Sequence, residues 1–320
     1  MKKFQVFGND KPIRNKETVS LTLGNFDGVH RGHKSLIQDL KDHSKAKFLG
    51  AITFEPHPAF FFCKEDAHKI LMTLDDKINY LLDTGLDFVV VQRFDEDFSR
   101  LKANDFCTKW LYENFRIETI VLGYDFHYGL QRQGDYKHMK SLASQLNWQV
   151  FQAHALKLNT HGIVSTSLIK SYLEEGYVES ATELLGHMHV FHGPVIEGDK
   201  RGAKLGYKTA NLNLPETLFK PKNGVYVCYV EIDGDGVYRE AIMNCGVRPT
   251  FDNSKRIHIE VHIYNFSKDI YGSSLKVFIV SFLRKEKKFN SLEALKTQIS
   301  HDIQESKKYF KENKILTNFA

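Results

Sequence analysis

The alternation of strand-like and helix-like segments stops near residue 188, and this change constrains the fold more than any other feature of the chain. Before it, runs such as VSLTLGNF, KFLGAITF, DFVVVQRF and IETIVLGYDF are separated by segments with the apolar spacing of amphipathic helices. Strands separated by helices of this length form βαβ units. The first part of the chain is therefore predicted to be an α/β domain with a mostly parallel sheet covered on both faces.

After residue 188 the apolar runs are short, and Gly, Asn, Asp and Pro separate them. HVFHGPVIEG, NGVYVCYVEIDG, VYREAIMNCG, RIHIEVHIYNF and SLKVFIVSFL follow one another with no helical segment until SLEALKTQISHDIQESKKYFKEN. This pattern is typical of a small antiparallel barrel followed by one helix. We read residues 165–186 as one helix bridging the two regions, and we place the boundary at Gly186, with domains 1–186 and 187–320.

Composition limits the classes of partner. The net charge of +5 is spread along 320 residues, without the basic stripe of a nucleic-acid-binding surface. No apolar run approaches the roughly 18 residues of a membrane helix, and the amino-terminal residues contain no apolar signal segment. The four cysteines include no CxxC pair. We expect a reduced, cytoplasmic protein that acts on an anionic small molecule, with neither nucleic acid nor membrane as partner; the oligomeric state is left open.

The densest cluster of chemically useful residues is GNFDGVHRGH, at positions 24–33. A strand ends at Gly24, a glycine-containing turn follows, and a helix is expected to begin near His33. Unsatisfied N–H groups at a helix start favour an anion, and His30 and His33 lie one turn apart, where both can face one phosphate. Two alternatives stay open on these residues alone: a tight turn with two solvated histidines, and a metal site built from the HxxH pair.

The same string resembles the HxGH signature of nucleotidylyltransferases, in the form found in bacterial bifunctional riboflavin kinase/FAD synthetases. Further strings follow in that family's order over nearly the whole chain: TFEPHP, LGYDFHYGLQRQGD, LLGHMHVFHGPVIEG, KLGYKTANL, NCGVRPTF and IEVHIYNF. The resemblance implies a Rossmann-like nucleotidylyltransferase domain followed by a β-barrel riboflavin kinase domain with a terminal helix. Such an enzyme phosphorylates riboflavin to FMN and adenylates FMN to FAD, with ATP as the substrate of both steps and Mg²⁺ as cofactor.

By this resemblance, His30 and His33 are the catalytic residues of adenylyl transfer, and they hold the α-phosphate of ATP. The turn that binds ATP is shaped by Gly24, Phe26, Asp27 and Gly28. His57 and Asp125 are implied to contact flavin or Mg²⁺. Read alone, Asp125 is equally a capping residue in a turn after a strand.

One string departs from the family pattern S-S-T-x-x-R, whose hydroxyls and arginine grip the outer phosphates of ATP. Here Ser165, Thr166 and Ser167 keep the hydroxyls, but Lys170 replaces the arginine. Lysine retains the charge and loses the planar fork that binds two oxygens at once. Read alone, Ser-Thr-Ser before an apolar segment is an ordinary helix N-cap.

In the second domain, the resemblance makes Glu260 the catalytic base, whereas its sequence context alone is that of a solvated strand residue. It assigns ATP and Mg²⁺ binding to Gly198, Gly202, Gly206, Thr209 and Asn211, with Thr209 and Asn211 as the Mg²⁺ ligands. Asn244, Gly246 and Thr250 are implied to shape the flavin site. Lys208 stands where the family has proline, so the fixed φ of proline is lost and a cation is gained.

Several functional alternatives remain at this level. The Lys170 departure leaves room for an enzyme that keeps only its kinase half, whereas the Lys208 departure puts the kinase half in question as well. A flavin-binding regulator with little turnover and a nucleotidylyltransferase for another phosphorylated acceptor are the other possibilities. The histidines of HMHVFH, at 187–192, either bind a metal or are simply polar residues at a domain junction.

Overall fold

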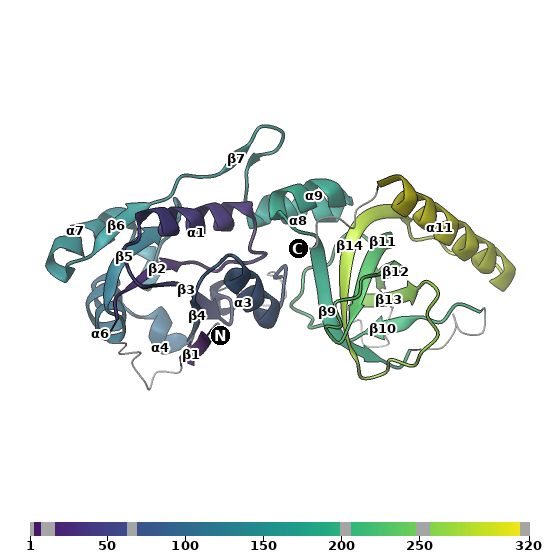
Figure 1. Ribbon diagram of the computed structural model, residues 1–320, viewed down its shortest axis with the longest axis horizontal. Coiled ribbons are helices and arrows are strands. Elements are labelled where there is room, and N and C mark those ends of the chain that lie inside the picture. The colour runs from purple at the N-terminus through teal and green to yellow at the C-terminus, as the bar shows by residue number, and fades with distance from the viewer. Residues whose placement is uncertain (1–2, 8–16, 63–68, 199–205, 248–256, 314–320) are drawn as a thin grey trace. The chain divides into compact units, whose positions relative to one another are not determined.

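The computed structural model describes residues 3–7, 17–62, 69–198, 206–247 and 257–313. The chain divides into two compact units, Met1–Thr166 and Ser167–Ala320 (Figure 1). The boundary between these compact units precedes the domain boundary that we expected at Gly186, and the helices between the two positions belong to the second unit. The domain boundary at Gly186 stays a prediction.

The first unit is built on a six-stranded sheet in the order β1-β4-β3-β2-β5-β6. Every pairing in it is parallel, as the strand–helix alternation predicts. The amino-terminal strand was not expected from the sequence. The strands are β1 (Lys3–Phe7), β2 (Val19–Leu23), β3 (Phe48–Glu55), β4 (Phe88–Arg93), β5 (Ile117–Leu122) and β6 (Gln149–Gln152), and a separate two-stranded hairpin comprises β7 (Lys157–Leu158) and β8 (Gly162–Ile163).

Helices connect these strands. They are α1 (Arg31–His43), α2 (Pro58–Phe62), α3 (Leu74–Asp83), α4 (Glu96–Ser99), α5 (Ala103–Asp105), η1 (Phe106–Leu111), α6 (Tyr112–Asn114), η2 (Leu130–Arg132) and α7 (Tyr136–Leu146). The segment ANDFCTKWLYENF is not one uniform α-helix, because η1 is a π-helical segment between two short α-helical turns. A π-bulge of this kind inserts extra chain into a helix without ending it.

Alternating side chains of the sheet form two apolar clusters. Leu21, Ile52 and Ile120 join one cluster, which also contains Phe106 of η1 and Met139 of α7. Side chains at the alternate strand positions point to the opposite face of the sheet. There, Ala51, Val89 and Val121 pack in a second cluster with residues of α1 and α3. Because successive strand side chains point to opposite faces, burial of both sets requires helices on both faces of the sheet.

The second unit begins with two helices, α8 (Thr166–Glu175) and α9 (Val178–Leu185). The expectation of one continuous helix over 165–186 is wrong. Gly176 adopts φ +84° between them, a conformation that glycine reaches without the penalty of a side chain. The Leu173 carbonyl accepts a hydrogen bond from the Lys222 N–H at 3.0 Å, so α8 packs with the second unit.

The rest of the second unit is a closed antiparallel barrel in the order β10-β13-β12-β11-β14-β9, as the β-rich pattern predicts. Figure 1 shows α11 lying along the outside of this barrel. The elements are β9 (His189–Ile196), β10 (Ala210–Leu212), β11 (Gly224–Ile232), β12 (Arg239–Val247), β13 (Ile257–Ile263), β14 (Ser274–Lys285) and α11 (Leu292–Asn313). The short β10 was not expected as a strand.

The terminal helix is fastened to the barrel by one buried ion pair. Arg284 of β14 donates two hydrogen bonds to Asp302 of α11, from Nε at 2.8 Å and from Nη2 at 2.6 Å. A paired guanidinium and carboxylate fix orientation as well as distance. Further along α11, Phe310 packs against Tyr229 of the barrel with ring centroids 4.8 Å apart. Among the described residues, no helix combines the length and the apolar character needed to cross a membrane.

The packing predicts a contrast between two isoleucines of the first unit. Ile120 is fully buried in the sheet, whereas 39% of Ile163 is exposed in the β8 hairpin. Ile120→Ala is expected to lower the free energy of unfolding by about 2–5 kcal/mol, because it leaves a cavity, and Ile163→Ala by less than about 1 kcal/mol. Urea denaturation followed by the fluorescence of Trp110 and Trp148, both in this unit, measures the difference. Equal losses in the two variants would contradict this packing.

Candidate functional site

The loop between β2 and α1 has an unusual backbone. Phe26, Gly28 and Val29 all have positive φ, at 52°, 80° and 37°. Bulky residues rarely occupy this region, and they do so where the surroundings compensate the strain. Phe26 and Val29 are fully buried, and the Val29 N–H donates to the Phe26 carbonyl at 3.1 Å. Apolar burial therefore holds the loop that connects the end of β2 to the start of α1.

The two histidines of this loop lie against each other at the start of α1. His30 is the N-cap, and its Nδ1 accepts a hydrogen bond from the His33 N–H at 3.2 Å. The two rings stack with centroids 3.6 Å apart and planes 12° apart. A side chain at Gly32 would lie 3.1 Å from the His30 ring, so glycine keeps this space free. The pair therefore forms a compact stack of two imidazole rings at a helix N-terminus.

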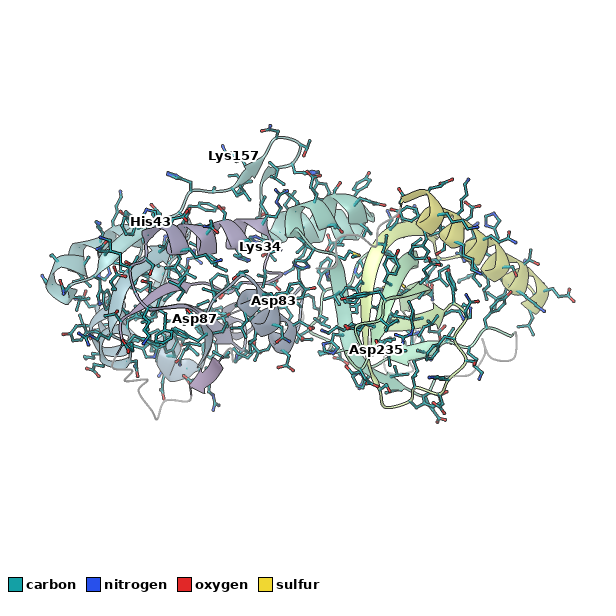
Figure 2. The ribbon with its side chains drawn as sticks, viewed as in Figure 1. Lys34, His43, Asp83, Asp87, Lys157 and Asp235 are labelled. Atoms are coloured by element: carbon teal, nitrogen blue, oxygen red, sulfur yellow. The ribbon has the colours of Figure 1, made fainter. Side chains whose placement is uncertain are left out.

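The electrostatics of the loop favour an anion. Burial lowers the pKa of His33 well below its usual 6.5, and the nearby His30 and Lys77 lower it further. The first turn of α1 has no acidic residue, although it carries Arg31 and Lys34; Figure 2 labels Lys34 on this helix. Cations at a helix N-terminus are unfavourable by themselves. Together with the helix dipole they make a place where a phosphate would be stabilised.

Contacts from distant segments fix the loop in position. The Leu71 N–H donates to Asp27 Oδ1 at 2.7 Å, and Thr53 Oγ1 donates to the Asn25 carbonyl at 3.1 Å. Thr166 Oγ1 donates to the Asp27 carbonyl at 3.2 Å. Of the hydroxyls proposed for phosphate binding, Thr166 is thus in contact with the histidine loop.

The remaining residues of the Ser-Thr-Ser string are positioned differently. Ser165 is half-buried directly before α8. Ser167 is exposed, and Lys170 lies one turn further along α8, where its Nζ is 6.0 Å from the ring centroid of Phe219. Ser167 and Lys170 belong to the second compact unit. Their role at the phosphates therefore stays a prediction.

His57 and Asp125 lie in the loops after two other strands of the sheet. His57 follows β3, is 9% exposed, and its Nδ1 accepts from the Ala59 N–H at 3.2 Å. Asp125 is exposed in a turn after β5 that the Phe126 N–H closes onto the Gly123 carbonyl at 3.1 Å. Both follow carboxyl ends of parallel strands, the edge where ligands bind in such sheets.

Two charged residues near this loop were missed by the sequence analysis. Lys77 of α3 is only 6% exposed, and Glu55 ends β3. Burial lowers the pKa of Lys77, and the negative charges of Glu55 and Asp27 act against this shift. Burial raises the pKa of Glu55, and the positive charge of Lys77 acts against that shift. The signal was present in the sequence, since Lys77 lies on the apolar stripe of α3, three residues after Leu74 and four before Leu81.

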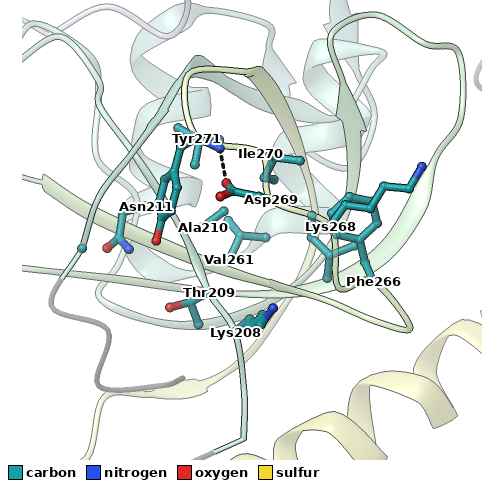
Figure 3. Close-up of a pocket in the computed structure, with 13 residues that line it drawn as sticks. Lys208, Thr209, Ala210, Asn211, Val261, Phe266, Lys268, Asp269, Ile270 and Tyr271 are labelled. Carbon is teal, nitrogen blue, oxygen red and sulfur yellow. Dashed lines mark hydrogen bonds between the residues drawn. The ribbon is translucent and has the colours of Figure 1, made fainter. Parts of the chain in front are cut away.

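The second unit contains a pocket of about 190 Å³ beside β10 (Figure 3). It includes Gly198, Lys208, Thr209 and Asn211, all four singled out from the sequence. Residues 266–271, between β13 and β14, form another wall and were not expected. In that wall the Tyr271 N–H donates to Asp269 Oδ1 at 3.0 Å.

Asn211 is the most constrained polar residue of this pocket. It is 5% exposed, and a Cβ at Gly198 would lie 2.0 Å from its Nδ2, so only glycine fits there. Its Oδ1 is buried and has no hydrogen-bond partner among the described residues. A buried oxygen without a partner is costly unless a ligand binds it. Together with the neighbouring Thr209, it is the kind of oxygen donor that suits Mg²⁺.

Lys208, which replaces the family's proline, is held by two hydrogen bonds. Its Nζ donates to the Ser267 carbonyl at 3.2 Å, and its own carbonyl accepts from His262 Nδ1 at 2.7 Å. The ring of His262 packs edge-on to Tyr207 at 5.5 Å. These contacts restrain the approach to Thr209 that a proline ring would restrain covalently.

The strand register places Glu260 in a row of polar residues. Glu260 of β13 pairs with Asn211 of β10 on one side and with Asn244 of β12 on the other. Its neighbours Ile259 and Val261 are buried in the barrel, so Glu260 faces outward, as the alternation predicts. His258 lies on the same face, with Nδ1 3.7 Å from Glu260 Oε1.

The predicted kinase site also includes Gly202, Gly206, Gly246 and Thr250. Gly246 is next to this row, and a Cβ there would meet Glu286 Oε1 at 2.2 Å. Gly206 adopts φ +90° with open space around it. Gly202 and Thr250 lie outside the described residues.

The histidines of HMHVFH do not converge. Rings of His187 and His192 hydrogen-bond the Met188 carbonyl and Ser274 Oγ, each at 2.8 Å. His189 is buried, and burial lowers its pKa to about 3, with His187 contributing. Within the described ranges, no group of three or more His, Cys, Asp or Glu residues could hold a metal ion.

Comparisons with known proteins match both units. The family model for FAD synthetase matches residues 12–167, and that for riboflavin kinase matches residues 185–310. A bifunctional riboflavin kinase/FMN adenylyltransferase of Buchnera aphidicola is 36% identical over 97% of this chain and 99% of its own length. The protein of the same name from Bacillus subtilis is 34% identical over 91% of this chain and 92% of its own.

One solved structure matches the described fold over most of its length. It is named as a macrolide-efflux protein from Streptococcus pneumoniae, and it superimposes with a TM-score of 0.84 at 26% identity. The match covers 95% of this chain and 98% of that one. Both compact units are therefore found together in another protein.

The buried His33 predicts a pH dependence of stability. Its folded pKa lies below 6.5, so below about pH 6.5 the unfolded chain binds a proton that the folded chain does not. This group therefore lowers the free energy of unfolding as the pH falls, by up to about 1.4 kcal/mol per pH unit. In His33→Gln, stability between about pH 6.5 and pH 5 should fall less steeply than in wild type, measured by urea titration with tryptophan fluorescence. Parallel curves would show that His33 does not carry this linkage.

Proposed function

This chain belongs to the family of bifunctional riboflavin kinase/FMN adenylyltransferases, and from that premise we propose which residues carry each reaction. The enzyme is a transferase that phosphorylates riboflavin to FMN and then adenylates FMN to FAD. We assign adenylyl transfer to the first unit and phosphorylation to the barrel. The family models divide the chain in the same order.

In adenylyl transfer, a phosphate oxygen of FMN attacks the α-phosphorus of ATP, and pyrophosphate leaves with the electrons of the broken P–O bond. The nucleophile is already an anion, so the protein needs to align the phosphates and offset their charge. His30 and His33 stack on each other at the N-terminus of α1, which supports their assignment to the α-phosphate. Thr166, bonded to the Asp27 carbonyl, is proposed to contact the outer phosphates, with Ser165, Ser167 and Lys170 of the same string.

In the kinase step, the ribityl 5′-hydroxyl of riboflavin attacks the γ-phosphorus of ATP, and ADP leaves. A neutral alcohol needs a base for its proton, and Glu260 is proposed to accept it. Thr209 and Asn211 are proposed to hold Mg²⁺, which would offset negative charge on the phosphates when bound. The buried Asn211 Oδ1, without a partner among the described residues, supports this choice. The strand register pairs Glu260 with Asn211 on one side and with Asn244 on the other, which supports a base and an ATP site on neighbouring strands.

The observation that carries the first half of this proposal is the stacked histidine pair at the N-terminus of α1. It offers two imidazole rings and the positive end of a helix dipole to a single anion. No carboxylate is present in that first turn to compete for the cationic groups.

A histidine substitution tests the first unit. His33→Gln is expected to slow FAD formation from FMN by about 10²–10³-fold, the typical effect of removing one group that stabilises the transition state. Formation of FMN from riboflavin should stay within twofold to threefold of wild type. The control is His43→Gln at the other end of α1, where the ring is exposed. A His33→Gln enzyme that makes FAD at the wild-type rate would remove His33 from the site.

A carboxylate substitution tests the barrel. Glu260→Gln keeps the shape of the side chain and removes the base, so FMN formation from riboflavin should fall by about 10²–10⁴-fold. FAD formation from added FMN should be unchanged. Glu293→Gln on the exposed side of α11 is the matched control. Separation of flavins by chromatography measures both steps, and unaltered riboflavin phosphorylation in Glu260→Gln would exclude Glu260 as the base.

A further inference from the structure

Lys77 is a buried cation that the assignments above do not use. It lies in the first turn of α3, where its N–H donates to the carbonyl of the N-cap residue Thr73 at 3.0 Å. Only 6% of its surface is exposed. Lysine is rarely buried to this extent unless its charge is paired, so the position requires an explanation.

The surroundings of Lys77 are those of the histidine loop. The Leu71 N–H, just before α3, donates to Asp27 Oδ1 at 2.7 Å. Ile78, the next residue after Lys77, packs in one apolar cluster with Phe26 and Val29 of the loop. The first turn of α3 therefore lies beside the loop proposed to bind the α-phosphate, and the charge of Lys77 acts on His33 and Asp27 of that loop.

The ammonium of Lys77 has no direct partner in the described part of the chain. No carboxylate oxygen lies within 4.0 Å of Nζ, and no hydrogen bond from Nζ is formed there. Asp27 and Glu55 are close enough for their charges to act on it without forming an ion pair. A buried charge in this state is costly, and a bound anion would remove that cost.

We propose that Lys77 is a phosphate-binding residue of the adenylyl-transfer site, and that its ammonium binds a phosphoryl oxygen of the reacting substrates. The inference rests on the function proposed for the first unit. It assigns to α3 a cation that works beside His30 and His33, where the negative charge of the reaction concentrates. It also supplies charge in a chain whose Ser-Thr-Ser string ends in Lys170 instead of the family's arginine.

The competing explanation is purely structural, since Lys77 could serve only to balance the charges of Asp27 and Glu55. Three variants separate the two roles. Lys77→Met removes the charge with little change in volume, Lys77→Arg retains a charge, and Lys77→Met/Glu55→Gln removes the lysine together with one of the carboxylates. FAD formation from FMN and FMN formation from riboflavin are measured on the full-length protein at varied ATP and FMN concentrations.

If Lys77 binds phosphate, Lys77→Met should lower kcat/KM for FAD formation by about 10²-fold, and Lys77→Arg should recover at least a tenth of the wild-type value. The double variant should stay as impaired as Lys77→Met. A raised KM for FMN assigns the contact to the FMN phosphate, and a raised KM for ATP assigns it to the triphosphate. The riboflavin kinase step should be unchanged in all three variants.

Two results would overturn the inference. FAD formation by Lys77→Met within threefold of wild type would do so, and so would recovery of activity in the double variant. If Lys77→Met does not fold, ¹⁵N-lysine NMR of the wild type with inorganic pyrophosphate and with FMN decides the point. The Nζ resonance that is missing in Lys77→Arg must shift with one of the two, and no shift with either refutes the contact. Failure of the wild type to make FAD from FMN would instead contradict the proposed function.

Discussion

The first unit depends on a strained turn that is held by burial. Phe26 and Val29 adopt positive φ, and both side chains are fully buried. This strain is tolerated because the rings and methyl groups anchor the loop in the cluster beneath α1 and α3. The buried turn places two histidines at the start of α1, where His30 caps the helix and His33 stacks on it. The position of the proposed phosphate-binding histidines thus follows from how the loop is packed.

In the barrel, strand register positions the polar residues of the predicted kinase site. Asn211, Glu260 and Asn244 come from three strands, and antiparallel pairing places them side by side on one face. A shift of one residue in β13 would bury Glu260 and expose Val261. Close packing of Gly198 against Asn211 and the hydrogen bonds of Lys208 to Ser267 and from His262 then fix the wall of the pocket that is proposed to bind ATP. Burial of the alternating apolar residues Ile259 and Val261 therefore sets the face on which Glu260 lies.

Features that rest on local pattern could be predicted from the sequence, and features that rest on tertiary contact could not. The parallel sheet, the barrel and the histidine turn each have a periodicity or a motif within a few residues. The short β10 has too few residues to show alternation, and the break at Gly176 looks like any glycine in a helix. The place of Lys77 on the apolar stripe of α3 shows in its spacing from Leu74 and Leu81, but its neighbours in the histidine loop do not. The wall around Asp269 reaches the pocket only through folding. Gly202 and Thr250 lie outside the described residues.

The central claim is that one chain carries both transfers, and a labelling experiment tests it most directly. Wild-type protein is incubated with riboflavin, Mg²⁺ and ATP labelled with ³²P at either the α or the γ position, and the flavins are separated by chromatography. The account predicts FMN labelled only from γ-labelled ATP, followed by FAD labelled from both. Riboflavin that stays bound while the ATP remains intact would contradict the account and indicate a flavin-binding protein without turnover.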